Sequence, residues 1–336
     1  MVKNNEIDLW KFIFSIIIVL LHSFSLFNNQ FLYMPGGSIG VDFFFLVSGY
    51  FMLQSINKRT NVQNGGAFIW HKLKKVLPYF YISCLIAFVL RTIFDIDGGV
   101  MLHKVLLLIN ELLLLQAAGF NVYAVTGSAW YLSAMFIAIA ILYPMATKYQ
   151  DTFLNIISPV IAILILGSLS AAYGNTSNPG YMIQGFLFLG LLKAIAEIAL
   201  GCFLYRVVEI FNSVQISGKQ KYIYTVLKYF LILFVIYFAS RKDSNSIILM
   251  SCVPCLFIGL MLTFSNQCYR IPQSVSKISD YLGELSIAIY LNNFYVALIV
   301  AKLFPWMTNN QKLGIYLVGV LVIADMVLYV VKWVRR

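Results

Sequence analysis

The sequence predicts an all-α, polytopic membrane bundle of about ten transmembrane helices. Of its 336 residues, 61% are hydrophobic and 11% are charged, a balance typical of membrane proteins rather than soluble domains. Ten apolar runs of about 20 residues are each long enough to cross the hydrocarbon core of a bilayer. The net charge of +11 comes largely from short basic loops between these runs. Because cations in such loops set membrane topology, we expect a lipid-bilayer environment and no nucleic-acid partner.

The ten apolar runs follow one another with short connections, and no internal repeat is visible. They cover residues 8–28, 38–56, 76–95, 127–146, 153–173, 182–206, 222–240, 246–265, 281–303 and 312–333. An eleventh run, 101–118, is shorter and contains Glu111, so we expect an interfacial or re-entrant helix there. We expect residues 1–336 to form a single transmembrane domain without an appended soluble domain.

Basic residues are distributed unequally between the two ends of the predicted spans. If Met1 starts in the cytoplasm, 16 of the 24 basic residues lie on that side, six on the other and two within spans. The positive-inside rule therefore places both termini in the cytoplasm. The inner loop at 57–75 carries Lys72, Lys74 and Lys75 among several Asn and Gly residues, which predicts a flexible basic strap.

The cysteines do not indicate a disulfide framework or a metal site. Cys252 and Cys255 have the spacing of redox and metal motifs, but a second ligand pair is missing and both lie in a predicted span. We therefore expect buried, inert thiols and no bound metal.

The first span contains two ionisable residues, Lys11 and His22. They are eleven residues apart, almost three helical turns, so they share one face and lie about 16 Å apart along it. Ionisable groups inside membrane spans are costly, which makes both residues candidates for function. For Lys11 the alternative is a side chain that reaches the lipid headgroups from near the helix end. For His22 it is a structural hydrogen bond to a carbonyl.

Asp42 enters the second span at a depth similar to that of His22. A carboxylate bonded to an imidazole fixes its tautomer and raises its basicity, as a general base requires. We therefore hypothesise that Asp42 contacts His22.

Four further polar or aromatic positions lie in later spans. Trp130 and Tyr131 open the fourth span from the outer side, either as part of an aromatic belt or as lining of a site. Lys193 and Glu197 are one turn apart in the sixth span, where they either neutralise each other or face a cavity.

The last two spans also contain polar residues. Asn292 and Asn293 are expected to break the ninth span near its middle, and Asp325 to be buried in the tenth. Such residues also act as hydrogen-bonded contacts between helices.

Four ordered stretches of the chain resemble one known family. They are Lys11 and His22 with ten residues between them, Gly-Gly-Ser-Ile-Gly-Val-Asp-Phe-Phe-Phe-Leu-Val-Ser-Gly-Tyr at 36–50, Trp130-Tyr131-Leu132, and Leu-Gly-Glu-Leu-Ser-Ile-Ala-Ile-Tyr-Leu at 282–291. In this order they resemble the acyltransferase 3 family of integral membrane acyltransferases, which includes bacterial O-acetyltransferases of surface polysaccharides. The resemblance extends over essentially the whole chain.

The resemblance implies a ten-helix enzyme of the bacterial plasma (inner) membrane. Such an enzyme transfers an acyl group, usually acetyl from cytoplasmic acetyl-CoA, to a hydroxyl of an envelope glycan or its lipid-linked precursor. By position, His22 is the implied catalytic histidine, Lys11 replaces the usual Arg, and Asp42 is the acidic residue after Gly-Val. Asn293 departs from the pattern, because many relatives have His there. Acetyl-CoA is a substrate, and no bound cofactor is implied.

These roles suit the chemistry of a thioester, which is already activated for transfer. The protein must orient the acceptor hydroxyl, remove its proton and stabilise the developing oxyanion. We assign His22 as the base and Asp42 as its orienter, with Ser48, Trp130, Tyr131 and Asn293 as lining groups. Lys72, Lys74 and Lys75 are expected to hold the anionic nucleotide of CoA, whose thiol arm then extends along the Lys11 face.

A transporter is the alternative interpretation. A broken ninth span and the pair of Lys193 and Glu197 would suit the movement of a small acid, an amino acid or an acyl-bearing lipid. Transporters commonly contain internal repeats, and the absence of a visible repeat favours the enzyme.

Overall fold

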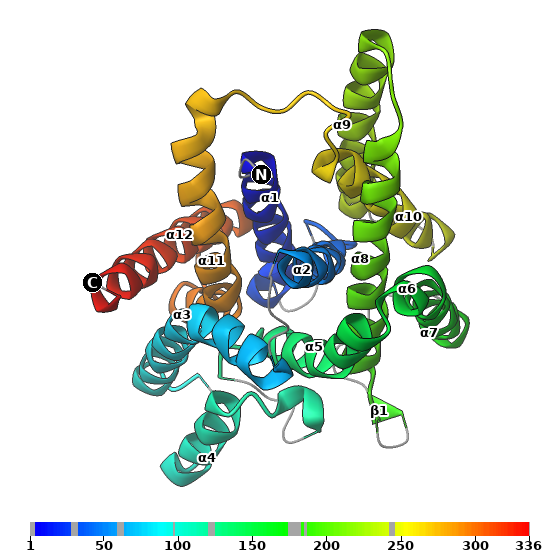
Figure 1. Ribbon diagram of the computed structural model, residues 1–336. Coiled ribbons are helices and arrows are strands. Elements are labelled where there is room, and N and C mark those ends of the chain that lie inside the picture. Colours follow the sequence, from blue (N-terminus) through cyan, green and yellow to red (C-terminus); the bar gives the residue numbers. More distant parts are fainter. Residues whose placement is uncertain are drawn as a thin grey trace.

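Long apolar helices make up most of the computed structural model (Figure 1). The structure describes residues 4–27, 33–58, 64–96, 98–119, 125–173, 183–184, 187–241 and 246–335. Within these ranges the strands are β1 (Ile183–Gln184) and β2 (Leu187–Phe188), which form one short antiparallel pair. The predicted all-α class is therefore confirmed for the described chain apart from this hairpin.

Eight segments of the described chain are long and apolar enough to cross a membrane. They are α1 with the 3₁₀ turn η1 (Asn5–Phe27), α2 (Ile39–Asn57), α3 (Gly65–Ile93), α5 (Trp130–Lys148), the run of α6, η3 and α7 (Gln150–Tyr173), α9 (Gly218–Ser240), α11 (Ser276–Leu303) and α12 (Asn309–Val334). Each overlaps a predicted span, and α3 begins eleven residues before the predicted third span, 76–95.

The two remaining predicted spans also overlap helices, although the start of the sixth, predicted at 182–206, contains β1 and β2. These helices are α8 (Leu189–Ser213), which carries several charged residues, and α10 (Ser246–Phe264). Eight crossings are supported by length and composition within the described ranges, so the count of ten remains a prediction. The placement of both termini in the cytoplasm likewise remains a prediction.

Helix α2 lies near the centre of the bundle, in contact with α1, α5 and α8 (Figure 1). Its closest approach to α8 is made by two glycines. A Cβ on Gly49 would lie 2.1 Å from the carbonyl oxygen of Ile198, and one on Gly201 would lie 2.1 Å from that of Leu46. Small residues let helix backbones approach in this way, which gains packing where lipid offers no hydrophobic driving force. Gly49, near the end of the 36–50 stretch, therefore allows α2 and α8 to cross in close contact.

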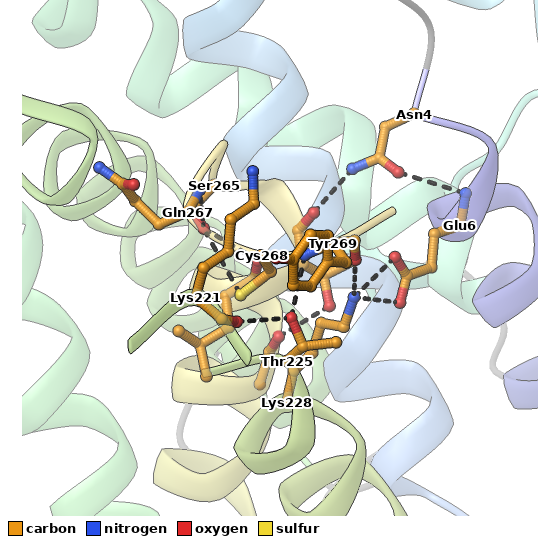
Figure 2. A network of polar contacts seen from close by, with 12 residues as sticks. Asn4, Glu6, Lys221, Thr225, Lys228, Ser265, Gln267, Cys268 and Tyr269 are labelled. Atoms are coloured by element: carbon orange, nitrogen blue, oxygen red, sulfur yellow. Dashed lines mark hydrogen bonds and ion pairs between the residues drawn. The ribbon is translucent and has the colours of Figure 1, made fainter. Parts of the chain in front are cut away.

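One end of α1 is attached to the rest of the bundle by a buried polar network (Figure 2). Asn4 caps α1 by accepting from the Glu6 amide at 3.2 Å, and its Nδ2 donates to the carbonyl of Thr263 at 2.8 Å. The Glu6 carboxylate lies 2.8 Å from Nζ of Lys228 on α9, which also donates to the Tyr269 carbonyl at 3.1 Å. Glu6 and Lys228 are both buried, so each charge neutralises the other.

Two expectations about the basic loop and the eleventh run are now resolved. Helix α3 already begins at Gly65, so Lys72, Lys74 and Lys75 lie on a helix and not on a flexible strap. Residues 59–63 lie outside the described ranges. Within 101–118 the structure has α4 (Met101–Leu112) and the 3₁₀ turn η2 (Gln116–Ala118). Twelve residues extend about 18 Å, too short to cross a bilayer.

Two expectations about the last spans were wrong. Helix α11 runs unbroken through Asn292 and Asn293, because their side chains bond to carbonyls three and four residues earlier and to other helices. Asp325 is exposed rather than buried, although it does join two helices by accepting from the Tyr281 hydroxyl at 2.7 Å.

Substitution of Gly49 by Ala is expected to destabilise the bundle by about 1–3 kcal/mol, because the added methyl group overlaps a backbone carbonyl that side-chain rotation cannot move. Thermal unfolding in detergent, followed by intrinsic fluorescence, measures this. Gly167→Ala on α7 (Ser158–Tyr173) is the matched control, since nothing lies within 4 Å of its added Cβ. Equal unfolding midpoints for the two variants would contradict the role given to this crossing.

Candidate active site

His22 lies where α1 (Asn5–His22) changes to a tighter turn. Residues Ser23–Phe27 form the 3₁₀ turn η1, and Ser23 Oγ donates to the Leu20 carbonyl at 2.6 Å. The imidazole Nδ1 lies 2.5 Å from Oδ1 of Asn293 on α11. The histidine near the end of the first span is thus bonded to the residue at which the chain departs from the family pattern.

The hydrogen bonds of Asn293 determine the tautomer of His22. Asn293 Nδ2 donates to the carbonyl of Tyr290 at 2.7 Å and approaches that of Ile289 at 3.4 Å. Because only the amide nitrogen can donate to carbonyls, Oδ1 is the atom that faces the imidazole. Nδ1 of the neutral ring must therefore carry the hydrogen, which leaves the lone pair on Nε2. An imidazole held in this way can accept a proton at Nε2.

The predicted contact between Asp42 and His22 is wrong. Asp42 instead pairs with Lys193 of α8, with 2.5 Å between Oδ1 and Nζ. Asn293 takes the orienting place that we assigned to Asp42. The physical reason is charge: a carboxylate buried to 1% exposure needs a cation more than it needs a neutral ring, and α8 presents one at the same depth.

Lys193 and Glu197 do neutralise each other in part, with 3.7 Å between Nζ and Oε1. With Asp42 they form a buried triad of one ammonium and two carboxylates, with exposed fractions of 1% for Asp42, 2% for Lys193 and 0% for Glu197. The triad connects α2 to α8 about two helical turns from the glycine crossing.

Ser48 and Tyr131 meet between α2 and α5, with 3.5 Å between Oγ and the phenol oxygen. The Tyr131 ring lies 5.3 Å from that of Tyr290 on α11, and Phe44 lies 6.2 Å from Tyr131 and 6.3 Å from Tyr290. Tyr131 is buried in the bundle and therefore does not belong to an interfacial belt. Both hydroxyls can donate hydrogen bonds, and aromatic rings surround the Tyr131 hydroxyl.

Trp130 also packs inside the bundle. Its ring lies 6.5 Å from that of Phe45 on α2 and 6.2 Å from that of Phe188 at the start of α8. Trp130 is half-buried, and these contacts pack it against α2 and the start of α8.

One face of α2 is less buried than the rest of the helix. Phe44, Ser48 and Phe51 are spaced by four and three residues, and each is half-buried while most of their neighbours are buried. Lys11 of α1 lies over Phe51, with Nζ 5.2 Å from the ring centroid, and is held by Asp8 at 2.8 Å. This half-buried stripe extends about 10 Å, from Lys11 at one end to Tyr131 at the other.

The structure does not bring the three lysines of α3 to His22. Lys72 lies 5.1 Å from the centre of the Phe68 ring and Lys74 lies 5.3 Å from that of Trp70, while Lys75 is exposed. They form a basic surface on the first half of α3.

Sequence reasoning did not single out Gly127 or Phe294. The Phe294 ring meets the His22 ring edge to face, with centroids 5.5 Å apart at 84°. Gly127 has a φ of +76°, and a Cβ there would lie 2.1 Å from Phe294 Cδ1. A non-glycine residue would therefore both be strained and displace the ring beside His22. The available signal was a glycine just before the Trp130 stretch.

No group of three His, Cys, Asp or Glu side chains within the described ranges is arranged to hold a metal ion. All five cysteines are free; Cys255 is half-buried and the other four are buried.

Comparison with known proteins adds evidence independent of this geometry. The sequence model of the acyltransferase 3 family, described as an acyltransferase domain, matches residues 4–329. The chain belongs to the acyltransferase 3 family. With its apolar helices, this acyltransferase 3 protein is an integral membrane protein, and the family indicates an acyltransferase.

One curated relative of this acyltransferase 3 protein is named for a different reaction from acyl transfer. A protein named amino-acid racemase, from Enterococcus faecalis, is 22% identical over 326 residues. The match covers 92% of this chain and 43% of the relative, so the chain spans less than half of that protein's length. No solved structure matches the chain.

Replacement of Lys193 by Met is expected to destabilise the protein by about 3–5 kcal/mol, because it leaves two buried carboxylates without a cation. Glu197→Gln is the matched comparison: it removes one negative charge and keeps the ion pair of Asp42 with Lys193, so its effect should be smaller. Unfolding midpoints in detergent measure both. A Lys193→Met variant as stable as Glu197→Gln would show that the triad is not needed for stability.

Proposed function

We propose that this protein is a membrane O-acyltransferase in which His22 is the general base. The observation that carries the proposal is the bond between His22 Nδ1 and Asn293 Oδ1, which leaves Nε2 able to accept a proton. The family supplies the reaction class, acyl transfer within a membrane bundle.

In the proposed reaction, His22 Nε2 removes the proton of an acceptor hydroxyl as its oxygen attacks the thioester carbonyl carbon. The carbon–sulfur bond then breaks, and the proton passes from the imidazolium to the departing thiolate. A thioester needs less activation than an amide or an ester of an alcohol. A neutral amide that fixes the imidazole without raising its basicity is therefore compatible with this chemistry. The hydroxyls of Ser48 and Tyr131 are our candidates to stabilise the oxyanion.

Acetyl-CoA is the proposed donor, and the half-buried stripe of Phe44, Ser48 and Phe51 is its proposed path. The basic surface of Lys72, Lys74 and Lys75 would hold the nucleotide phosphates, because ammonium groups bind phosphate as point charges. Lys11 lies at the near end of the stripe. Its pairing with Asp8 lowers the local positive charge, so we assign Lys11 to a polar part of the thiol arm rather than to the phosphates.

The proposed acceptor is a hydroxyl of an envelope glycan or its lipid-linked precursor, at the outer side of a bacterial inner membrane. This part of the proposal rests on the family resemblance. His22 is predicted to lie in the outer half of the first span, the side on which such an acceptor would be reached.

Transport of an amino acid or another small acid is the second candidate function. The buried triad of Asp42, Lys193 and Glu197 favours it. Broken helices are typical of transporter sites, so the continuous helix α11 counts against transport.

His22→Ala is expected to reduce acetyl transfer and acetyl-CoA hydrolysis by about 10²- to 10⁴-fold, the usual contribution of a general base. The measurement uses purified protein in liposomes with a panel of envelope glycans, at equal yields of folded protein. His103→Ala is the matched control, because His103 is exposed on α4. A native chain that transfers no acyl group, while amino-acid uptake into the liposomes depends on Lys193, would favour transport instead.

Asn293→Ala is expected to lower kcat roughly 10- to 100-fold with little change in KM for acetyl-CoA, because the imidazole loses the acceptor that fixes its tautomer and orientation. Steady-state kinetics with acetyl-CoA as the varied substrate measure both constants. Asn292→Ala on the same helix, which binds Ser83 and not His22, is the control. Loss of activity in Asn292→Ala alone would contradict the assignment.

A further inference from the structure

We propose that Glu111 is a positioning residue for His22, acting through the turn of residues 125–128. The inference deepens the proposed function, since it concerns the same histidine. Glu111 contacts neither His22 nor the half-buried stripe, and its effect passes through backbone and ring contacts.

The Glu111 carboxylate is buried to 1% exposure in the last turn of α4. Oε1 accepts from the Thr126 hydroxyl at 2.5 Å and from the Thr126 amide at 3.1 Å, while Oε2 accepts from the Val125 amide. An ionised carboxylate offers only acceptors, which suits three converging donors. These bonds offset the cost of burying the charge and fix the backbone of the turn.

The turn is held from a second side by α3. Arg91 Nη1 donates to the carbonyl of Val125 at 2.5 Å. The amide and the carbonyl of Val125 are therefore bound by different helices, with Glu111 on one side and Arg91 on the other. This arrangement leaves the segment before Gly127 little freedom.

From the turn, one route to His22 runs through hydrogen bonds with α11. Ser128 Oγ donates to the Tyr290 carbonyl at 3.0 Å, and the Tyr290 hydroxyl donates to the Ser128 carbonyl at 3.0 Å. The same Tyr290 carbonyl accepts from Asn293 Nδ2, the bond that orients Asn293 toward His22. A carbonyl oxygen has two lone pairs, so both donors can be accommodated.

A second route runs through direct packing. Gly127 presses against Phe294, and the Phe294 ring meets His22 edge to face. A shift of the turn would therefore change both the hydrogen-bond partner and the ring contact of His22. Both routes begin at the backbone that Glu111 holds.

Glu111→Gln is the test variant, because its amide group would present a donor to backbone amides that also donate. We expect kcat to fall roughly 10- to 100-fold, with KM for acetyl-CoA changed less than about twofold, as for misplacement of a reacting group. Asp95→Asn is the matched control: it makes the same acid-to-amide change at a carboxylate that pairs with Lys104 of α4, at 3.4 Å, and is largely exposed.

A second readout does not depend on activity. Diethyl pyrocarbonate modifies neutral imidazole, and mass spectrometry of the peptide that contains His22 gives its rate of modification. We expect this rate to change severalfold in Glu111→Gln and to stay at the native value in Asp95→Asn. If the native chain shows no acyl transfer but the His22 rate changes, the proposed function fails and the positioning role stands.

Thr126→Val covers the case in which Glu111→Gln does not fold. It removes one donor to Glu111 and keeps both backbone amides, so we expect smaller changes in the same direction for kcat and for His22 modification. The proposal would be overturned if a folded Glu111→Gln variant kept the native kcat and the native rate of His22 modification. If Glu111→Gln does not fold, the same result in Thr126→Val would overturn it.

Discussion

The ion pair of Asp42 with Lys193 fixes how α2 sits on α8, and the rest of the bundle is arranged around α2. In an apolar interior, neither charge is stable without the other, so the two helices are held at one register. The crossing of Gly49 and Gly201 brings the same two helices into backbone contact. Together these features orient the opposite face of α2, with Phe44, Ser48 and Phe51, toward α1, α5 and α11. The candidate site thus depends on charges that take no part in it.

Buried charge is handled in the same way at other places. Glu6 is neutralised by Lys228, and Glu111 is satisfied by hydrogen-bond donors. Glu6 and Lys228 join segments that are distant in the sequence, whereas Glu111 binds residues 14 and 15 positions further along the chain. His22 differs from these groups, because its partner is the neutral amide of Asn293.

Much of the fold was predictable from the sequence, because the length of an apolar run is set by the thickness of the bilayer. His22 was identifiable for a related reason, because an ionisable residue inside a span is energetically costly and therefore marks a candidate functional position.

The partner of His22 could not be identified from the sequence. Depth in the membrane placed Asp42 and His22 at one level, but depth does not say which faces of two helices meet. Lys193 was treated as the partner of Glu197 on its own helix, and a third charge on another helix could not be anticipated from spacing. The unbroken course of α11 was missed for a similar reason, because Asn side chains can bond to their own helix backbone as well as interrupt it.

Helix α3 (Gly65–Ile93) is longer than a membrane crossing requires. Its 29 residues extend about 44 Å, longer than the hydrocarbon core, with the basic surface near its start and Arg91 near its end. Pro78 is its one interior proline, a point at which the helix can bend. Pro78 lies between Lys72, Lys74 and Lys75 on one side and Arg91, which holds the Val125 carbonyl, on the other. One helix thus carries both the basic surface and the guanidinium that holds the backbone beside Gly127, with the proline between them.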